Sequence, residues 1–91
     1  MSVGFQMESE PFLNVKLAFT HPAHGSVSHY IQDFSPFNTI KQLKQDMAGK
    51  LAVPVEKQVW KYKGDVLYDA QTLDDVNLDD GDVIEVSSRA A

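Results

Sequence analysis

Three histidines, His21, His24 and His29, are the residues whose type and spacing come nearest to a metal site in this chain. Imidazole nitrogens bind zinc when several of them converge on one point. Here they lie on one predicted hairpin, two of them in its turn, and nothing in the sequence fixes their relative geometry. A histidine in a loop is usually an ordinary polar residue, so we expect no metal ion and no cofactor.

The acidic run 75–81, with the sequence DVNLDDG, resembles the beginning of a calcium-binding loop. Such a loop needs glycine at its sixth position and glutamate at its twelfth. Counted from Asp75, these two positions are Asp80 and Val86. The run is therefore predicted to be a solvated turn.

Catalytic motifs are absent from the sequence. There is no cysteine, which excludes a thiol nucleophile. We find no nucleophile elbow, glycine-rich phosphate loop or zinc-binding helix motif either. Trp60 and Tyr62 could stack on nucleic-acid bases, but alternate strand positions are typical of packing residues. We predict that the protein is not an enzyme.

The net charge of −5 is unevenly distributed along the 91 residues. Six lysines and two acids lie between positions 41 and 63, whereas eight acids and one arginine follow position 64. An acidic chain does not favour nucleic-acid binding, but this polarity could steer a protein partner. No run approaches the ~20 apolar residues that span a bilayer, and no signal peptide is visible. We expect an intracellular monomer, in the cytoplasm, the nucleus or both, with no membrane partner.

Two alternating segments, 12–19 and 27–34, predict a pair of strands joined by a turn. The register of the second strand is open between two possibilities. Strict alternation turns Tyr30, Gln32 and Phe34 inward and buries the glutamine. A bulge would instead turn Ile31 and Phe34 inward.

A helix is predicted after Thr39, whose hydroxyl can form a capping box with Gln42. Apolar residues then recur at helical spacing up to Leu51, and Pro54 prevents the helix from continuing. Further strands are predicted at 59–63, 66–68 and 83–87, with Trp60 and Tyr62 facing inward. The order is β-β-α-β-β-β. We expect an α+β domain at 11–88, a flexible lead-in at 1–10 and a tail at 89–91.

From position 39 to 86 the sequence resembles ubiquitin without a gap. The shared residues open the helix, follow it, enter the third strand and recur in the long segment before the last strand: Thr39, Ile40, Lys44, Pro54, Gln58, Gly64, Leu67, Asp69, Thr72, Leu73, Asp75 and Asn77. The last strand is more similar to that of SUMO. The resemblance implies a β-grasp fold, a mixed sheet of four to five strands packed on one helix, with the first and last strands adjacent and parallel.

The resemblance also implies where partners bind. Ubiquitin's apolar patch is centred on an isoleucine, and Lys61 occupies the corresponding position here. Glu85 and Ser87 correspond to the histidine and the valine beside that isoleucine. We expect the contact area at Lys61, Lys63, Glu85 and Ser87. Lys61 and Glu85 are predicted to face each other across neighbouring strands, in a surface pair worth under ~1 kcal/mol.

A second candidate surface is the groove between the second strand and the helix. The resemblance to SUMO implies that an extended peptide could add a strand there. The groove is expected to involve His29, Tyr30 and Ile31 on the strand, with Lys41 and Lys44 on the helix, and to favour acidic or phosphorylated peptides. The alternative is an ordinary sheet edge beside a solvated helix.

No pair of glycines follows the last strand, whereas conjugated relatives end in Gly-Gly. We therefore expect a noncovalent interaction domain of a larger protein in ubiquitin-, SUMO- or proteasome-related processes. Its partners would be ubiquitin receptors, proteasomal subunits or conjugating enzymes. Two alternatives stay open: a covalent modifier seen without its Gly-Gly tail, and a ubiquitin-like domain of an RNA-processing factor.

Overall fold

A computed structural model describes residues 12–23 and 25–89. The expected lead-in, His24 and the last two residues of the expected tail lie outside this range. The elements occur in the predicted order, with a short 3-10 helix added before the third strand. They are β1 (Leu13–Thr20), β2 (Val27–Phe34), α1 (Ile40–Leu51), η1 (Val55–Lys57), β3 (Gln58–Tyr62), β4 (Asp65–Val66) and β5 (Val83–Ser88).

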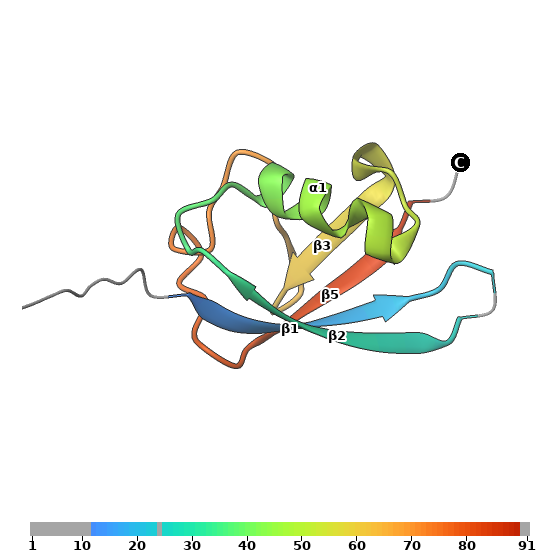
Figure 1. The fold of residues 1–91 in the computed structure, drawn as a ribbon, viewed down its shortest axis with the longest axis horizontal. Helices are drawn as coiled ribbons and strands as arrows, with labels where there is room; N and C mark the ends of the chain where they lie inside the picture. The colour runs from blue at the N-terminus through green and yellow to red at the C-terminus, as the bar shows by residue number, and fades with distance from the viewer. Residues whose placement is uncertain (1–11, 24, 90–91) are drawn as a thin grey trace, which may run out of the picture.

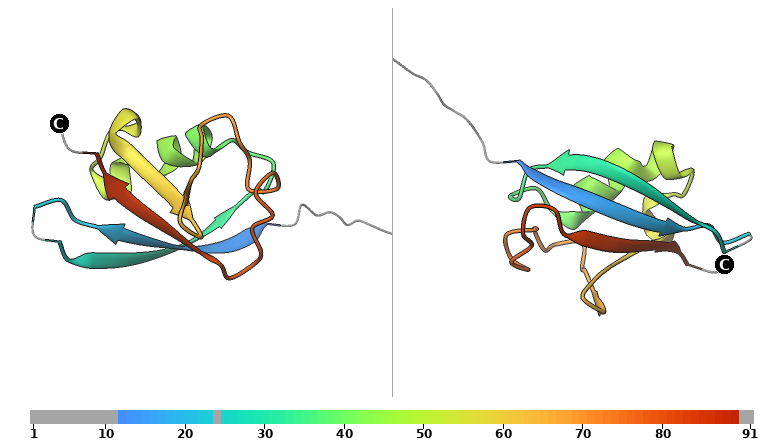
Figure 2. Two further views of the ribbon diagram at one scale, coloured as in Figure 1. Left: turned by 180° about the vertical axis from the view of Figure 1, so that it is seen from behind. Right: turned by 90° about the horizontal axis from the view of Figure 1, so that it is seen from below.

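The sheet has five strands in the order β2-β1-β5-β3-β4, and α1 lies across one of its faces (Figure 1). β1 pairs with β5 in parallel, and the other neighbours pair antiparallel. Figure 2 shows β2, β1 and β5 side by side. The predicted mixed sheet on one helix, with adjacent parallel first and last strands, is confirmed.

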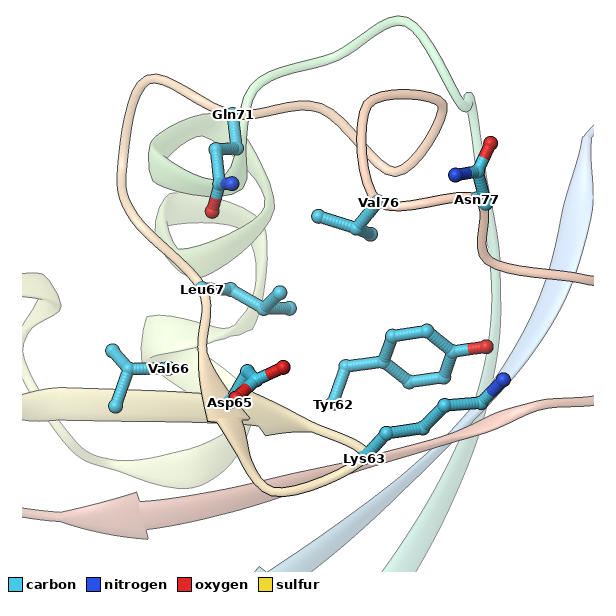
Figure 3. A pocket seen from close by; sticks show the side chains of 8 residues that line it. All are labelled: Tyr62, Lys63, Asp65, Val66, Leu67, Gln71, Val76 and Asn77. Carbon is cyan, nitrogen blue, oxygen red and sulfur yellow. The ribbon is translucent and has the colours of Figure 1, made fainter.

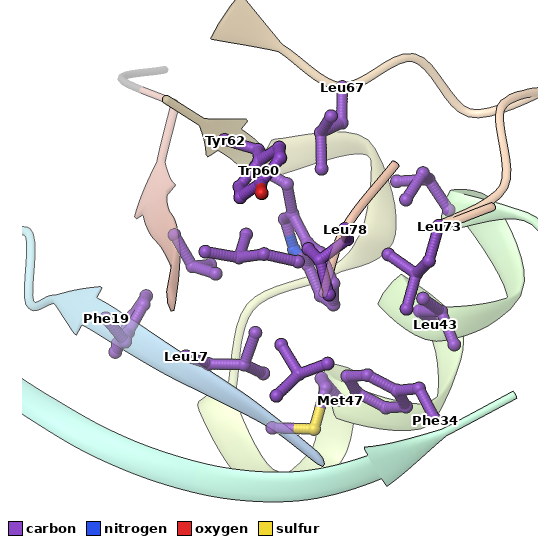
Figure 4. Packing of buried hydrophobic residues seen from close by; sticks show 14 of the residues in the cluster. Leu17, Phe19, Phe34, Leu43, Met47, Trp60, Tyr62, Leu67, Leu73 and Leu78 are labelled. Carbon is purple, nitrogen blue, oxygen red and sulfur yellow. The ribbon is translucent and has the colours of Figure 1, made fainter. Parts of the chain in front are cut away.

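The core lies between the helix and the inner face of the sheet (Figure 4). Alternate residues of β1 point into it, as the sequence pattern predicted. Trp60 is fully buried and Tyr62 nearly so, which confirms them as packing residues. The helix contributes its predicted apolar face, formed by Ile40, Leu43, Met47 and Leu51.

Helix α1 begins and ends as predicted. The Thr39 hydroxyl accepts a hydrogen bond from the Gln42 amide (3.3 Å), and the Gln42 side chain accepts one from the Thr39 amide (2.8 Å). These two bonds satisfy amide groups that the first helical turn leaves unpaired. At the other end the backbone turns left-handed at Ala52, with φ 58°.

Strict alternation, one of the two registers left open for β2, is the one observed. Pairing with β1 is continuous from Leu13 opposite Phe34 to Thr20 opposite Val27, without a bulge. Gln32 turns inward but stays half-buried, and its side-chain oxygen accepts a hydrogen bond from Lys50 Nζ over 3.1 Å. The cost expected for burying a glutamine is avoided because its amide keeps both partial exposure and a partner.

The fourth strand is shorter than the predicted 66–68. β4 ends at Val66, although the Leu67 amide still donates to the Trp60 carbonyl over 2.8 Å. The Tyr68 amide donates instead to the side chain of Gln71 over 2.7 Å, which takes it out of the ladder. Leu67 is thereby fixed with its side chain in the core.

Candidate protein-interaction surface

The outer face of the sheet, opposite the helix, carries three of the predicted contact residues. The register places Lys61 of β3 directly opposite Glu85 of β5, and Glu85 beside Ala18 of β1. Ser87 follows on the same face of β5, beside Thr20. Side chains of a strand alternate between faces, so burying Trp60 and Val86 is what exposes this set.

These residues surround one hollow of about 330 Å³, which we call the outer-face hollow. Its lining comes from four strands: Ala18, Thr20, Val27, Lys61, Glu85, Val86 and Ser87. The charged groups, Lys61 and Glu85, sit on neighbouring strands, and the remaining lining is small, hydroxylated or branched. Such a hollow can bind an anionic group at Lys61 or a cationic group at Glu85, with a small apolar group beside it.

Lys63, the fourth predicted contact residue, lies apart from this hollow. It follows β3 in the turn to β4, where its backbone is left-handed (φ 53°). Its ammonium lies 5.2 Å from the centre of the Tyr62 ring, within the range of a cation–π contact. It lines a different hollow, of about 410 Å³, whose wall includes Tyr62, Leu67 and Val76 (Figure 3).

Behind that second hollow, the Tyr62 hydroxyl donates a short hydrogen bond to the Asp82 carboxylate. The bond raises the pKa of Tyr62 above its usual value, with burial as a smaller contribution. The same bond, followed by one from the Asp79 amide, lowers the pKa of Asp82. The pair therefore stays protonated on tyrosine and ionised on aspartate near neutral pH.

The predicted groove residues of β2 do lie on an edge strand, because only β1 flanks β2. His29 and Ile31 are exposed and occupy the outer-face positions, opposite Ala18 and Lys16. Tyr30 is half-buried and packs against the core. These three residues therefore face two sides of the strand and do not line one groove together.

Lys44, predicted to face this groove, is placed elsewhere. Its ammonium pairs with Asp69 at 2.7 Å, and its side chain is only 9% exposed. Lys41 lies three positions before Lys44 on α1, about 60° from it around the helix axis, and its backbone amide donates to the Asp69 carbonyl over 3.1 Å. The ammonium of Lys44 is therefore held by Asp69 and not by a residue of β2, and the place of Lys41 beside the groove stays a prediction.

The lysine that does reach β2 is Lys50, through its bond to Gln32. This lysine was not predicted from the sequence. The helical spacing offered a signal, because Lys50 follows Lys41 by nine positions, which places the two lysines on opposite sides of a helix. The β1 lining residues Ala18 and Thr20 were also missed. No local pattern reveals them, since they join the site only through the pairing of β1 with β5.

No metal-binding group of three or more histidine, cysteine or acidic side chains occurs in the described parts of the chain, 12–23 and 25–89. His21 Nε2 lies 2.8 Å from the Ser28 hydroxyl, and its ring packs edge-on against Phe19. Within the same residues, no helix has the length and apolar character required to cross a bilayer.

Comparison with known proteins gives one family. Residues 13–90 match the model of the ubiquitin family. Ubiquitin from Caldiarchaeum subterraneum has a similar structure, with a TM-score of 0.76 and 22% identity over 89% of this chain and 98% of the other. The ubiquitin-like domain of Dsk2 from Plasmodium falciparum has a TM-score of 0.74 and 24% identity over 86% and 99%. The C-terminal ubiquitin-like domain of the human 2'-5'-oligoadenylate synthetase-like protein has a TM-score of 0.69 and 23% identity, over 92% of this chain and 93% of the other.

Proposed function

This chain belongs to the ubiquitin family, and on that basis we propose that it is a noncovalent protein-interaction domain of a larger intracellular protein. It acts in the cytoplasm or nucleus, in processes that involve ubiquitin, SUMO or the proteasome. Its partners are receptors, proteasomal subunits or conjugating enzymes. It performs no catalysis of its own.

The opposition of Lys61 and Glu85 at the outer-face hollow carries this proposal. The resemblance places Lys61 where ubiquitin has the isoleucine at the centre of its patch. A partner that seats an apolar surface there would have to desolvate an ammonium and a carboxylate, which is costly unless both are paired. The proposed partner therefore offers a carboxylate to Lys61 and a donor to Glu85, with complementary charge setting specificity.

The edge of β2 is a second contact area within the same proposal. An edge strand leaves backbone N–H and C=O groups free to pair with an extended peptide. His29 and Ile31 would contact such a peptide from the outer face. Any preference for acidic peptides would come from Lys50, which lies beside β2, in place of Lys44.

Solved structures with this fold support the assignment to a larger protein. The Dsk2 and oligoadenylate synthetase-like structures are each described as a ubiquitin-like domain of a named protein, the second as its C-terminal domain. A third similar structure is an N-terminal ubiquitin-like domain. The same fold is thus used at either end of longer chains.

An NMR titration tests the proposed surface. The isotope-labelled chain is titrated with ubiquitin receptors, a proteasomal receptor subunit and a SUMO-conjugating enzyme. We expect amide shifts around Lys61, Glu85 and Ser87 with at least one of them, and about tenfold weaker binding for Lys61→Ala, a typical loss for a central contact. Lys41→Ala, an exposed lysine on the helix, is the matched control. Shifts confined to residues outside the outer face would refute the assignment.

A thioester assay separates this function from covalent modification. The full-length gene product is incubated with ATP and the activating enzymes for ubiquitin and for SUMO. The proposal predicts no adduct that a reducing agent releases. Formation of such an adduct would establish a covalent modifier instead.

A further inference from the structure

Three segments meet at the end of the domain where β1 begins, at the left of Figure 1. They are the start of β1, the connection from β2 to α1, and the loop that precedes β5. Between them lies a hollow of about 310 Å³, lined by Leu13, Pro36, Phe37, Asp74, Asn77, Leu78 and Asp79. We call it the polar-end hollow. It shares no lining residue with the outer-face hollow.

Hydrogen bonds hold the walls of the polar-end hollow together. The Asp74 amide donates to the Pro36 carbonyl over 3.0 Å, which joins the loop to the connection after β2. The Gly81 amide donates to the Asn14 carbonyl, and the Asn14 amide donates to the Asp80 carboxylate, both over 2.7 Å. The shape of the hollow is thus set before any partner arrives, which lowers the entropic cost of binding.

A large apolar side chain is exposed in the wall of this hollow, since Phe37 is 65% exposed. Phe12, the sequence neighbour of the lining residue Leu13, is 56% exposed and lies outside the lining. Leu13 and Leu78 lie beneath, packed on the core. Exposed aromatic rings next to a concave surface are typical of binding sites, because a ring buries a large area with little loss of side-chain freedom.

The charge around these rings is negative. Asp74 and Asp79 are the charged members of the lining. Two further carboxylates stand nearby, because both Asp33 and Asp80 accept hydrogen bonds from Asn14, the neighbour of Leu13. A hollow with apolar residues in its wall and carboxylates around it is complementary to an apolar side chain that has cationic neighbours.

We propose that the polar-end hollow docks an extended segment of a partner protein in which an apolar side chain is flanked by arginine or lysine. Charge disfavours the other possible occupants. Residues 1–11 of this chain include two acids, Glu8 and Glu10, just before β1 in the sequence. A second copy meeting through a two-fold axis would bring the same carboxylates together. This proposal is independent of the outer-face function.

Fluorescence anisotropy with a defined probe tests the proposal. The probe is a labelled peptide with two leucines flanked by arginines, and the comparison peptide replaces each arginine with glutamate. We expect the arginine peptide alone to bind, more weakly at higher salt, and to shift the amide resonances of Phe37, Asp74 and Asp79. Phe37→Ala should weaken it about tenfold, and Asp79→Lys about fivefold by charge reversal.

Matched controls use a ring and a carboxylate elsewhere. Tyr68→Ala removes a ring that is 68% exposed, and Asp65→Lys reverses the charge of an exposed carboxylate. Both should leave affinity within about twofold. Equal losses in the control and test variants would overturn the proposal, as would binding of the glutamate peptide. If Phe5→Ser strengthens peptide binding, residues 1–11 occupy the hollow. If dilution of the protein shifts the same resonances, a second copy of the chain occupies the hollow. Either result also overturns the proposal.

Discussion

The indole N–H of Trp60 donates a hydrogen bond to the side-chain oxygen of Gln58 over 2.9 Å, inside the protein. The amide nitrogen of Gln58 donates in turn to the carbonyls of Lys44 and Val53, each over 3.0 Å. One buried glutamine thus ties β3 both to α1 and to the segment that follows it. Burying an amide is tolerated here because its oxygen and both of its N–H groups have partners.

Replacing Gln58 should therefore be strongly destabilising. Gln58→Leu leaves the Trp60 N–H and two carbonyls buried without this partner, so we expect a loss of about 2–4 kcal/mol in the free energy of unfolding. Urea denaturation followed by tryptophan fluorescence measures it. Gln45→Leu, at an exposed helix position, should change stability by less than about 0.5 kcal/mol. A loss of similar size in both variants would contradict the role of the Gln58 bonds.

The left-handed residue at the end of α1 offers a stabilising change. Ala52 has φ 58°, a conformation that costs an alanine roughly 1 kcal/mol and a glycine almost nothing. We expect Ala52→Gly to raise the free energy of unfolding by about 0.5–1 kcal/mol. Ala48→Gly, inside the same helix, should lower it by about 1 kcal/mol. Thermal melts of the two variants must move in opposite directions for this explanation to hold.

The Tyr62–Asp82 bond predicts loss of stability at both ends of the pH range. The pKa of Asp82 is lowered by folding, so its contribution is present above the unfolded value of about 3.9 and is lost as the pH falls through the folded pKa. The pKa of Tyr62 is raised by folding, so its contribution is complete below about 10 and is lost as the pH rises through the folded pKa.

Tyr62→Phe keeps the buried ring and removes this bond. Urea unfolding across a pH series should show a flatter acid and alkaline dependence in the variant than in the wild type. Tyr68→Phe, on an exposed ring, serves as the control. Identical pH profiles for wild type and Tyr62→Phe would show that the bond does not contribute.

The opposed positions of Lys61 and Glu85 at the outer-face hollow predict a change of binding specificity. Lys61→Ile together with Glu85→His supplies the residue types that ubiquitin carries at these positions. We expect this double variant to bind a ubiquitin receptor about tenfold more tightly than the wild type, because no charge then has to be desolvated at the contact. Isothermal calorimetry measures it, with Lys41→Ile as the control. An unchanged affinity would mean that Lys61 and Glu85 do not limit the interaction.

Much of this fold was predictable because its signals are local. Alternation along β1 follows from the backbone's period of two, and the Thr39–Gln42 capping box lies within one helical turn. Those predictions were confirmed. The second-strand register was left open because it depends on whether Gln32 finds a partner. That partner, Lys50, lies 18 positions away.

A partner distant in the sequence was not foreseen for Lys44. This lysine was predicted to lie beside the β2 groove, but Asp69, 25 positions later, pairs with its ammonium. The fourth strand is shorter than predicted for a different reason, since the side chain of Gln71, three positions later, takes the amide of Tyr68. Competition of a side chain for a backbone amide that could join the ladder is not visible in the alternation of apolar residues.

The sequence by itself determined the element order, the helix cap, the buried rings of Trp60 and Tyr62, and the outward direction of Lys61 and Glu85. Backbone periodicity and short-range bonding dictate all of these. Only the tertiary structure decided which outward residues share a surface. Glu85 lies beside Ala18 because β5 pairs in parallel with β1, and Phe37 lines the same hollow as Asp79 because loops far apart in the chain close on the same end of the sheet. Binding surfaces on small domains are made by such closures, in which the pairing of strands brings distant segments together.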